Sequence, residues 1–138
     1  MTSSAIAVNL SGQSALVTGA SSGIGAAVAK ALAANGAFVW VNHPDEASAD
    51  AATEVVSRIT SAGGKAQMVQ ADVSCEADVL KMFQEIEGAG LDILVNNAGI
   101  AHSSPIEALE VADFDHLIGV HLRGTFLCTR SALKKMYA

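Results

Sequence analysis

The chain has 138 residues, of which 51% are hydrophobic, 16% charged and 4% aromatic, and its formal net charge is −6. This length suits one domain with a buried core, and the apolar, alanine-rich composition excludes a disordered chain. The lysines and arginines are few and scattered, which argues against a nucleic-acid partner because phosphate backbones are bound by clustered basic side chains.

No part of the sequence indicates export or a membrane partner. Residues 1–13 lack a basic region followed by a long apolar run, and no stretch of about 18 apolar residues occurs. We therefore expect a soluble, cytoplasmic protein. Cys75 and Cys128 lie far apart, without Cys-x-x-Cys spacing or a histidine at ligand spacing. They predict two buried, reduced thiols and no metal site.

Strand and helix patterns alternate along the chain after a loose arm over residues 1–12. In chain order we predict a strand at 14–18, a helix at 23–35, a strand at 38–41, a helix at 47–61, a strand at 66–71, a helix capped by Ser74, a strand at 91–95 and a long helix at 112–136. In the first helix Ile24, Val28 and Leu32 recur four apart, as on one face, and many alanines allow close approach to a sheet. Gly119 and Gly124 predict close packing or a bend in the long helix.

This alternation predicts an α/β fold with right-handed crossovers and a doubly wound parallel sheet, the Rossmann architecture. We expect the strand order 3-2-1-4, with the long helix at the C-terminal end. Residues 1–138 would then form a single dinucleotide-binding domain. Ligands bind such sheets beyond the carboxyl ends of the strands, where the strand order reverses.

The glycine-rich segment after the first strand is the main candidate site. Gly19, Gly23 and Gly25 lie between that strand and the first helix. Free N–H groups at a helix start attract phosphate, and glycines let it reach the backbone. The G-x-x-x-G-x-G spacing differs from G-x-G-x-x-G and the loop has no lysine, so a purely structural turn is the alternative. The Asn-Asn-Ala-Gly loop at residues 96–99 ends the fourth strand at the same edge, which favours a dinucleotide held by its pyrophosphate.

Four segments, in this order, resemble the short-chain dehydrogenase/reductase superfamily: TGASSGIG at 18–25, DV at 72–73, NNAG at 96–99 and VHLRGTF at 120–126. The resemblance covers the chain but only the N-terminal half of such enzymes. It is greatest to bacterial glucose 1-dehydrogenases and 3-oxoacyl-carrier-protein reductases. It implies hydride transfer between NAD or NADP and an alcohol or carbonyl compound, such as a sugar or a 3-oxoacyl group.

The resemblance also implies which residues contact the cofactor. Those around the pyrophosphate and adenosine ribose would be Gly19, Ser21, Ser22, Gly23, Ile24 and Gly25. Asp72 would hydrogen-bond the adenine amino group with Val73 along the ring, although a role beside the helix cap at Ser74 is an equal alternative. Asn97, Ala98 and Gly99 would line the adenosine and nicotinamide-ribose side, while Asn96 would tie strands together.

The end of the second strand should distinguish NAD from NADP, because an acidic residue there holds the ribose 2′-hydroxyl and a basic one accepts a 2′-phosphate. This chain has Asn42, His43 and Pro44, with Asp45 one residue later and no lysine or arginine there. We expect Asn42 and His43 near the ribose, and the choice of cofactor stays open. For His43 an exposed turn histidine is the alternative.

The chain departs from the family in two ways. His121 stands where the family has an asparagine that holds a water in its proton relay, and a histidine could donate or accept a proton there. The family's catalytic serine and Tyr-x-x-x-Lys would lie beyond Ala138. Tyr137 lacks a lysine four residues later, so it predicts a frayed helix end and not an acid/base.

Two functions follow from these departures. The chain is either the cofactor half of an oxidoreductase, which meets a small substrate only when the missing half is supplied, or a non-catalytic dinucleotide-binding or assembly module. An unpartnered fourth strand and an apolar face on the long helix would favour self-association in either case.

Overall fold

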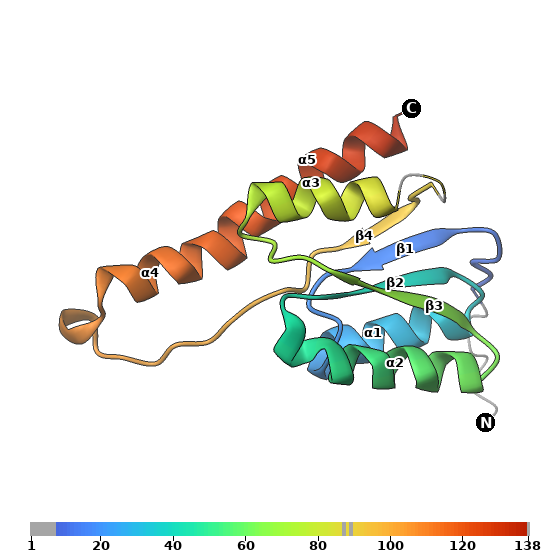
Figure 1. Ribbon diagram of the computed structural model, residues 1–138, viewed down its shortest axis with the longest axis horizontal. Helices are drawn as coiled ribbons and strands as arrows, with labels where there is room; N and C mark the ends of the chain where they lie inside the picture. The colour runs from blue at the N-terminus through green and yellow to red at the C-terminus, as the bar shows by residue number, and fades with distance from the viewer. Residues whose placement is uncertain (1–7, 87, 89, 138) are drawn as a thin grey trace, which may run out of the picture.

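Four parallel strands form one sheet in the order β3-β2-β1-β4, which confirms the predicted order (Figure 1). The computed structural model describes residues 8–86, 88 and 90–137, so most of the predicted N-terminal arm lies outside the described residues. The strands are β1 (Ser14–Val17), β2 (Phe38–His43), β3 (Lys65–Gln70) and β4 (Ile93–Val95). Val17 pairs with Val41 and with Val95, so β1, β2 and β4 reach the same edge of the sheet.

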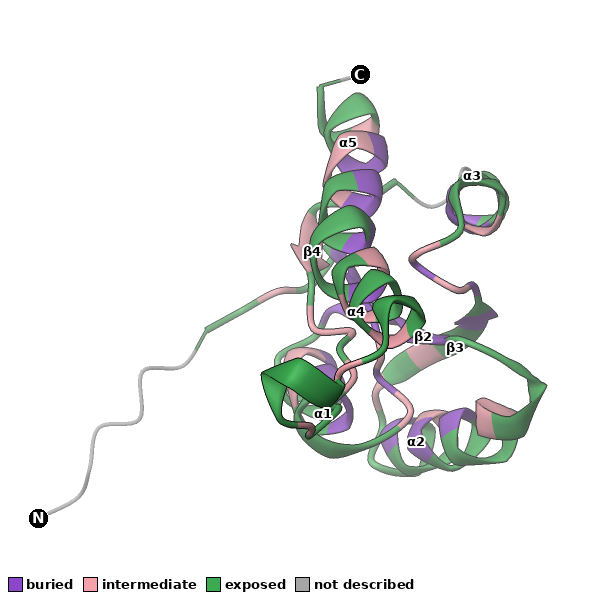
Figure 2. Ribbon diagram, turned by 90° about the vertical axis from the view of Figure 1, so that its left-hand side faces the viewer, coloured by how far each residue is buried: buried purple, intermediate pink, exposed green. Residues whose placement is uncertain are grey.

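Helices cover both faces of the sheet, which confirms a doubly wound fold (Figure 1). The helices α1 (Gly23–Ala34) and α2 (Ala49–Ser61) lie on one face, with the short 3₁₀ segment η1 (Glu46–Ser48) leading into α2. The helices α3 (Glu76–Glu85) and α5 (Gly124–Met136) lie on the other. The buried residues of these helices face the sheet (Figure 2).

Small side chains fill the face under α1 and α2. Ala15 and Val17 of β1 are fully buried there, and α1 packs through Gly25, Ala26, Ala29 and Ala33. The expected close approach of the alanines is confirmed, because small side chains bring the helix backbone near the strands. Ile24 does not share this face and is 78% exposed.

Larger side chains fill the opposite face. Leu16 and Trp40 from the sheet pack with Val79, Met82 and Phe83 of α3, with Ile86 directly after it, and with Leu127, Cys128 and Ala132 of α5. Each large side chain buried in this way stabilises the fold by about 1.5–3 kcal/mol. The predicted apolar stripe of α3 is confirmed.

Two expectations about the start of α3 are wrong. Cys75 occupies the N-cap position and is exposed, whereas we expected a buried thiol there and a cap at Ser74. Ser74 is not the cap because its N–H and hydroxyl both donate to the Asp72 carboxylate, at 2.9 and 2.7 Å. Cys128 is buried, as expected.

The predicted long helix comprises α4 (Val111–Ile118), the π-helical turn η3 (Gly119–Arg123) and α5. A Cβ added at Gly124 would lie 2.7 Å from Cγ2 of Val73, so the expected close packing is confirmed. No helix within the described residues is long and apolar enough to cross a membrane.

Candidate functional site

A cleft of about 490 Å³ opens beyond the carboxyl ends of the strands, at the edge where the strand order reverses between β1 and β4. The predicted contact residues that line it are Gly19, Ser22, Gly23, Ile24, Asn42, Asp72, Val73, Asn97, Ala98 and Gly99. Ser21, Gly25 and His43 are not part of its lining. The residues that line it without having been predicted are Pro44, Asp45, Ala71, Ile100, His116 and Val120.

The β1–α1 loop packs against the end of β4 with no room for a side chain between them. A Cβ at Gly19 would lie 2.8 Å from the Ala98 Cα, and Gly19 also has φ +60°. A Cβ at Gly25 would lie 2.5 Å from the Gly19 carbonyl oxygen and would overlap the Asn97 side chain. Because the obstructing atoms belong largely to backbone, glycine is required at both positions.

Hydrogen bonds between Thr18 and Asn97 join the two loops that border the cleft. The Thr18 hydroxyl oxygen accepts from the N–H groups of Asn97 and Ala98, each at 3.0 Å. The Asn97 side chain donates to the carbonyl oxygens of Thr18 and Gly19, at 3.0 and 3.1 Å. The resemblance implied strand-tying for Asn96, but Asn96 donates to Thr129 of α5 at 3.0 Å, and Asn97 makes the connection instead.

Asn42 holds the β1–α1 loop from the other side. Its side chain is 1% exposed, and its Oδ1 accepts from the Gly19 N–H at 3.0 Å. Its Nδ2 donates to the carbonyl oxygens of Val69 and Ala71, at 3.3 and 3.1 Å. Asn42 therefore borders the cleft, while its amide group is engaged in holding the backbone around the cleft.

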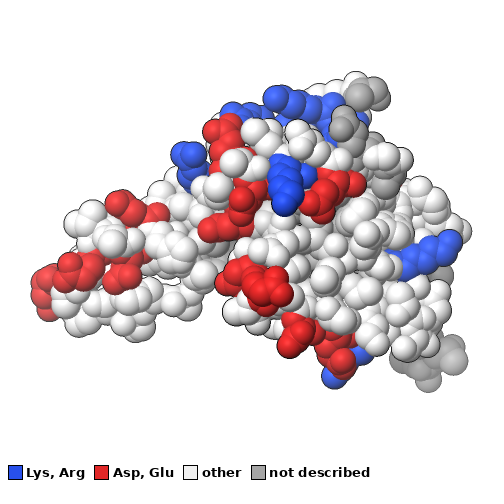
Figure 3. Space-filling model, in the orientation of Figure 1, with Lys and Arg blue, Asp and Glu red and all other residues white. Residues whose placement is uncertain are grey.

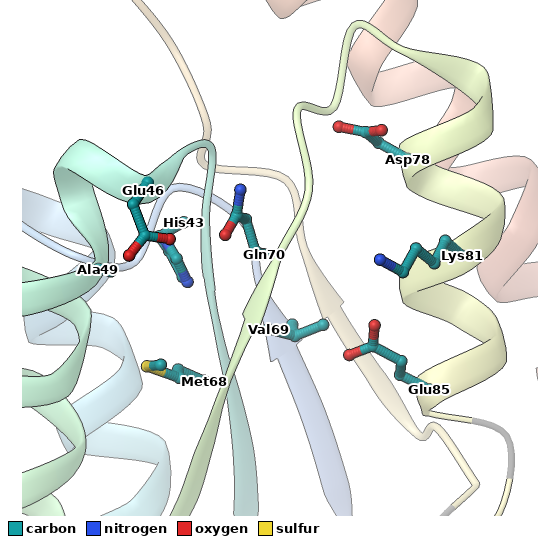
Figure 4. Close-up of a pocket in the computed structure, with 9 residues that line it drawn as sticks. All are labelled: His43, Glu46, Ala49, Met68, Val69, Gln70, Asp78, Lys81 and Glu85. Carbon is teal, nitrogen blue, oxygen red and sulfur yellow. The ribbon is translucent and has the colours of Figure 1, made fainter.

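His43 lines a second cavity of about 400 Å³, which lies beside β3 between η1 and α3 (Figure 4). The ring is 2% exposed, and its Nδ1 lies 2.9 Å from the Asp45 carbonyl oxygen and 3.3 Å from the Ser48 hydroxyl. The alternative of an exposed turn histidine is therefore wrong. Among the described residues no group of three or more histidine, cysteine, aspartate or glutamate side chains is arranged to hold a metal ion.

Asp72 fits both of its predicted roles in part. Its Oδ1 accepts from the N–H and hydroxyl of Ser74, which is the expected local role, and Asp72 is also a lining residue of the cleft. The backbone N–H of Asp72 donates to Oδ2 of Asp78 at 3.1 Å and so fixes the turn before α3. The contact with adenine remains a prediction.

His121 lies in η3 and is not part of the cleft lining. Its Nε2 is 2.7 Å from the carbonyl oxygen and 3.1 Å from the amide nitrogen of Ile100. A Cβ at Gly99 would lie 2.8 Å from its Cε1. His121 thus holds the backbone of Ile100, which lines the cleft, and its suggested part in proton transfer remains a prediction.

Asp45 is a charged residue that lines the cleft. It follows Pro44, one residue beyond the strand-end segment in which we expected the side chain near the ribose. Its Oδ1 accepts from the N–H of Ser48 at 3.0 Å and from its hydroxyl at 2.8 Å, which forms a capping box at η1. The Asp-x-x-Ser spacing is a signal that identifies such a cap in sequence. No lysine or arginine is part of the described lining of the cleft.

On the face in Figure 3, acidic side chains gather at the end that carries α4, and basic ones lie along α5.

Known proteins resemble this chain in both sequence and structure. A 3-oxoacyl-[acyl-carrier-protein] reductase from Synechocystis is 42% identical over 129 residues, which cover 92% of this chain and 51% of the relative. A dehydrogenase/reductase structure from Sinorhizobium meliloti has a TM-score of 0.88 and 44% identity, covering 94% of this chain and 51% of that one. A short-chain dehydrogenase from Burkholderia cenocepacia in complex with NADP has a TM-score of 0.86 and 40% identity, covering 92% and 52%.

The chain therefore spans about half the length of the relatives that it matches. Residues 13–138 match the family described as short chain dehydrogenase. That match, the strand order and the glycine-bordered cleft agree, and the chain belongs to the short-chain dehydrogenase family.

Proposed function

We propose that the chain is the cofactor-binding portion of an NAD(P)-dependent oxidoreductase that moves hydride between a nicotinamide and an alcohol or carbonyl compound. The observation that carries this proposal is the cleft at the β1–β4 edge, bordered by Gly19 and Gly23 on one side and by Asn97 on the other. Ligands of doubly wound folds bind at this place. The NADP complex of the Burkholderia relative supports the same cofactor class.

The start of α1 suits a phosphate ligand. Its N-cap, Ser22, makes no side-chain capping hydrogen bond, so the first N–H groups of this 12-residue helix remain available to a ligand. Gly23 has φ +55°, and a Cβ built there meets nothing within 4 Å, which leaves the backbone open to an approaching pyrophosphate. When bound, the nicotinamide cofactor supplies the hydride chemistry. The residues of this chain bind and orient it.

The substrate-side chemistry is proposed to come from sequence beyond these 138 residues, which contain no Tyr-x-x-x-Lys segment. In that arrangement residues 1–138 form one dinucleotide-binding domain, and His121 holds the Ile100 backbone beside the cleft. The Synechocystis relative supports a 3-oxoacyl substrate, and a sugar is the alternative from the sequence. A Tyr-x-x-x-Lys codon run downstream of codon 138 would support this arrangement.

Fluorescence titration tests the proposal directly. The 138-residue chain is titrated with NADH and with NADPH, and we expect saturable binding of at least one of them that ADP reverses. Turnover of a sugar or acetoacetyl substrate by this chain alone is not expected. The proposal is wrong if a chain with native helical content binds neither nucleotide.

A second candidate, a non-catalytic module that assembles with another copy, is favoured by exposed apolar side chains on α4 and α5. Phe114 is 49% exposed, Ile118 42% and Phe126 56%. Apolar groups on one helical segment favour association, as an unpaired edge of β4 would. Light scattering should show dimers or larger species, and Phe126→Ser should reduce them. A single monomeric species at all concentrations would contradict this candidate.

We also propose a cytoplasmic location. Both cysteines are free, as expected for a protein in a reducing compartment. Fractionation of cells that express the protein would test this.

A further inference from the structure

We infer that the second cavity, beside β3, is a binding site for the ammonium group of a small alkylamine. This site is separate from the nucleotide cleft, because no described residue lines both. The ammonium group donates hydrogen bonds to His43, Glu46 and Gln70, and the alkyl chain lies along Met68. The inference concerns a ligand other than the dinucleotide and does not depend on the proposed function.

His43 supplies a buried acceptor that the fold itself does not use. The ring is 2% exposed, and its Nδ1 lies 2.9 Å from the Asp45 carbonyl oxygen, which can only accept. Nδ1 therefore carries the proton, and the neutral ring presents Nε2 as an acceptor. Among the described residues Nε2 has no hydrogen-bond partner. The enclosed side-chain atoms without a partner there are Ser14 Oγ and Trp40 Nε1, so Nε2 is not sealed in the core and faces the cavity that the ring lines.

Two more acceptors lie at the same end of the cavity. Glu46 from η1 and Gln70 from the end of β3 lie on the same side of β3 as the His43 ring (Figure 4). Within the part of the chain that the structure describes, neither side chain makes a hydrogen bond or an ion pair. An alkylammonium group has three N–H donors and no acceptor, which suits a carboxylate, an imidazole nitrogen and an amide oxygen. Its hydrogen bond to the carboxylate is charge-assisted and therefore among the stronger ones.

The charges of the cavity favour a cation over an anion. Three carboxylates line it, those of Glu46, Asp78 and Glu85, together with one ammonium group, that of Lys81. Lys81 shares α3 with Asp78 and Glu85, at spacings of three and four residues, so it offsets part of their charge on that side of β3 (Figure 4). Glu46, on the η1 side, has no lysine or arginine beside it in the described lining. The positive charge of the ligand is therefore best accommodated on the η1 side.

The rest of the lining on this side suits a short alkyl chain. Met68 is 41% exposed, and with Ala49 of α2 it provides apolar surface on the side of β3 that carries His43 (Figure 4). The Thr53 hydroxyl donates to the Met68 sulfur at 3.4 Å, which holds this side chain in place. A cavity of about 400 Å³ has room for a ligand of a few carbon atoms. An ammonium head on a short chain therefore matches both kinds of surface.

Butylammonium is the probe that tests this site. Its binding to the 138-residue chain is followed at pH 8, where histidine is ordinarily neutral, through the NMR signals of the His43 ring. We expect a Kd of about 1 mM, which is reasonable for so small a ligand. 1-Butanol has a similar chain without the charge, and tetramethylammonium has the charge without an N–H donor. Each should bind at least about tenfold more weakly. Equal binding of butylammonium and 1-butanol, or His43 signals that do not move, would overturn the inference.

Glu46→Gln tests the carboxylate without disturbing the core, because Glu46 is exposed. The Kd for butylammonium should rise at least about tenfold. Asp50→Asn is the matched control. It removes the same charge four residues later, in the first turn of α2 and outside the cavity lining, and should change the Kd by less than about twofold at physiological salt. The same loss of affinity in both variants would show that Glu46 does not contact the ligand, and would overturn the site.

A lysine side chain of another protein carries the same ammonium group, so Nα-acetyl-lysine methylamide is titrated beside butylammonium. Tighter binding of butylammonium supports a free amine as the ligand, whereas tighter binding of the blocked lysine would overturn that assignment in favour of a protein partner. These titrations are made without nucleotide. Their failure would leave the proposed function intact, and a chain that binds no NADH would still be expected to bind the amine.

Discussion

The β1–α1 junction and the long helix at residues 111–136 differ in how completely their surroundings constrain them. At the junction, Gly19 and Gly25 touch neighbouring backbone, and the polar groups of Thr18, Asn42 and Asn97 bond within the fold. The long helix buries one side and leaves large apolar side chains exposed on another. The close contacts around Gly19 and Gly25 make these two positions intolerant of change, whereas the helix should tolerate changes on its open side.

The largest expected effect comes from a side chain added inside the junction. In Gly25→Val the new Cβ would lie 2.5 Å from the Gly19 carbonyl oxygen, so the loop or the end of β4 has to move. Overpacking of this kind costs about 1–3 kcal/mol or more. We expect a lower urea midpoint. We also expect the Kd for NADH to rise by about a hundredfold.

Gly88→Ala is the matched control for this variant, since a Cβ there meets nothing within 4 Å. Its urea midpoint and its NADH affinity should equal those of the unmodified chain. If Gly25→Val binds NADH as well as Gly88→Ala does, the junction is not the rigid unit that the distances indicate.

The next largest effect is expected at the buried amide behind the loop. Asn42→Ala leaves the Gly19 N–H and the carbonyl oxygens of Val69 and Ala71 without this partner. Unpaired buried groups cost about 1–3 kcal/mol each, and we expect about 3 kcal/mol less stability in urea unfolding. Asn35→Ala, at the exposed end of α1, removes only a hydrogen bond to Ala31 and should cost under about 1 kcal/mol. Equal losses in the two variants would contradict the role given to Asn42.

The junction could be predicted from the sequence because its signals are local. A strand, three closely spaced glycines and a helix follow one another within residues 14–34, and the strand order follows from the alternation of elements. The burial of Asn42 and His43 could not be predicted in this way. Their partners lie on β3 and η1, and polar residues at a strand end are as typical of a turn as of a core.

The long helix shows a different limit of sequence analysis. Its apolar residues were recognisable, but not which of them would be buried. Val120 and Leu127 face the core, while Phe114 and Phe126 remain about half exposed. The π turn changes the spacing that a regular helical repeat assumes, and the close contact of Gly124 with Val73 depends on a partner far away in the chain.

A smaller effect is expected at the contact of α3 with α5, where the two thiols differ. Burial raises the pKa of Cys128 from its ordinary value of 9.0 to about 12, whereas Cys75 is exposed. The unfolded chain loses the Cys128 proton near pH 9 and the folded chain does not, so stability is full below pH 9 and falls between pH 9 and 12. At pH 8 a thiol reagent should label Cys75 at once and Cys128 only after unfolding. Equal labelling of both in the folded chain would contradict the burial of Cys128.

The smallest effect is expected from the ion pair across the same contact. A hydrogen bond from Arg130, together with its charge, lowers the pKa of Glu76 below its ordinary value of 4.5. A lowered pKa contributes stability above pH 4.5, which is lost as the pH falls through the folded-state value. Because both side chains are well exposed, the gain is slight. Glu76→Gln should lower the urea midpoint slightly at pH 7, and by less at pH 3. The same difference at both pH values would show that the charge is not responsible.

The π turn at Gly119–Arg123 also constrains which insertions and deletions the chain can accept. Each residue of a regular helix advances the winding by about 100°, and a π turn holds one residue more than an α turn. Deleting a single residue there would convert the π turn into an α turn, so that α5 keeps its orientation, with Gly124 against Val73 and Cys128 in the core. The same deletion within α4 or α5 would rotate everything beyond it by about 100°. The π turn is therefore the place in the long helix where the loss of one residue should be tolerated.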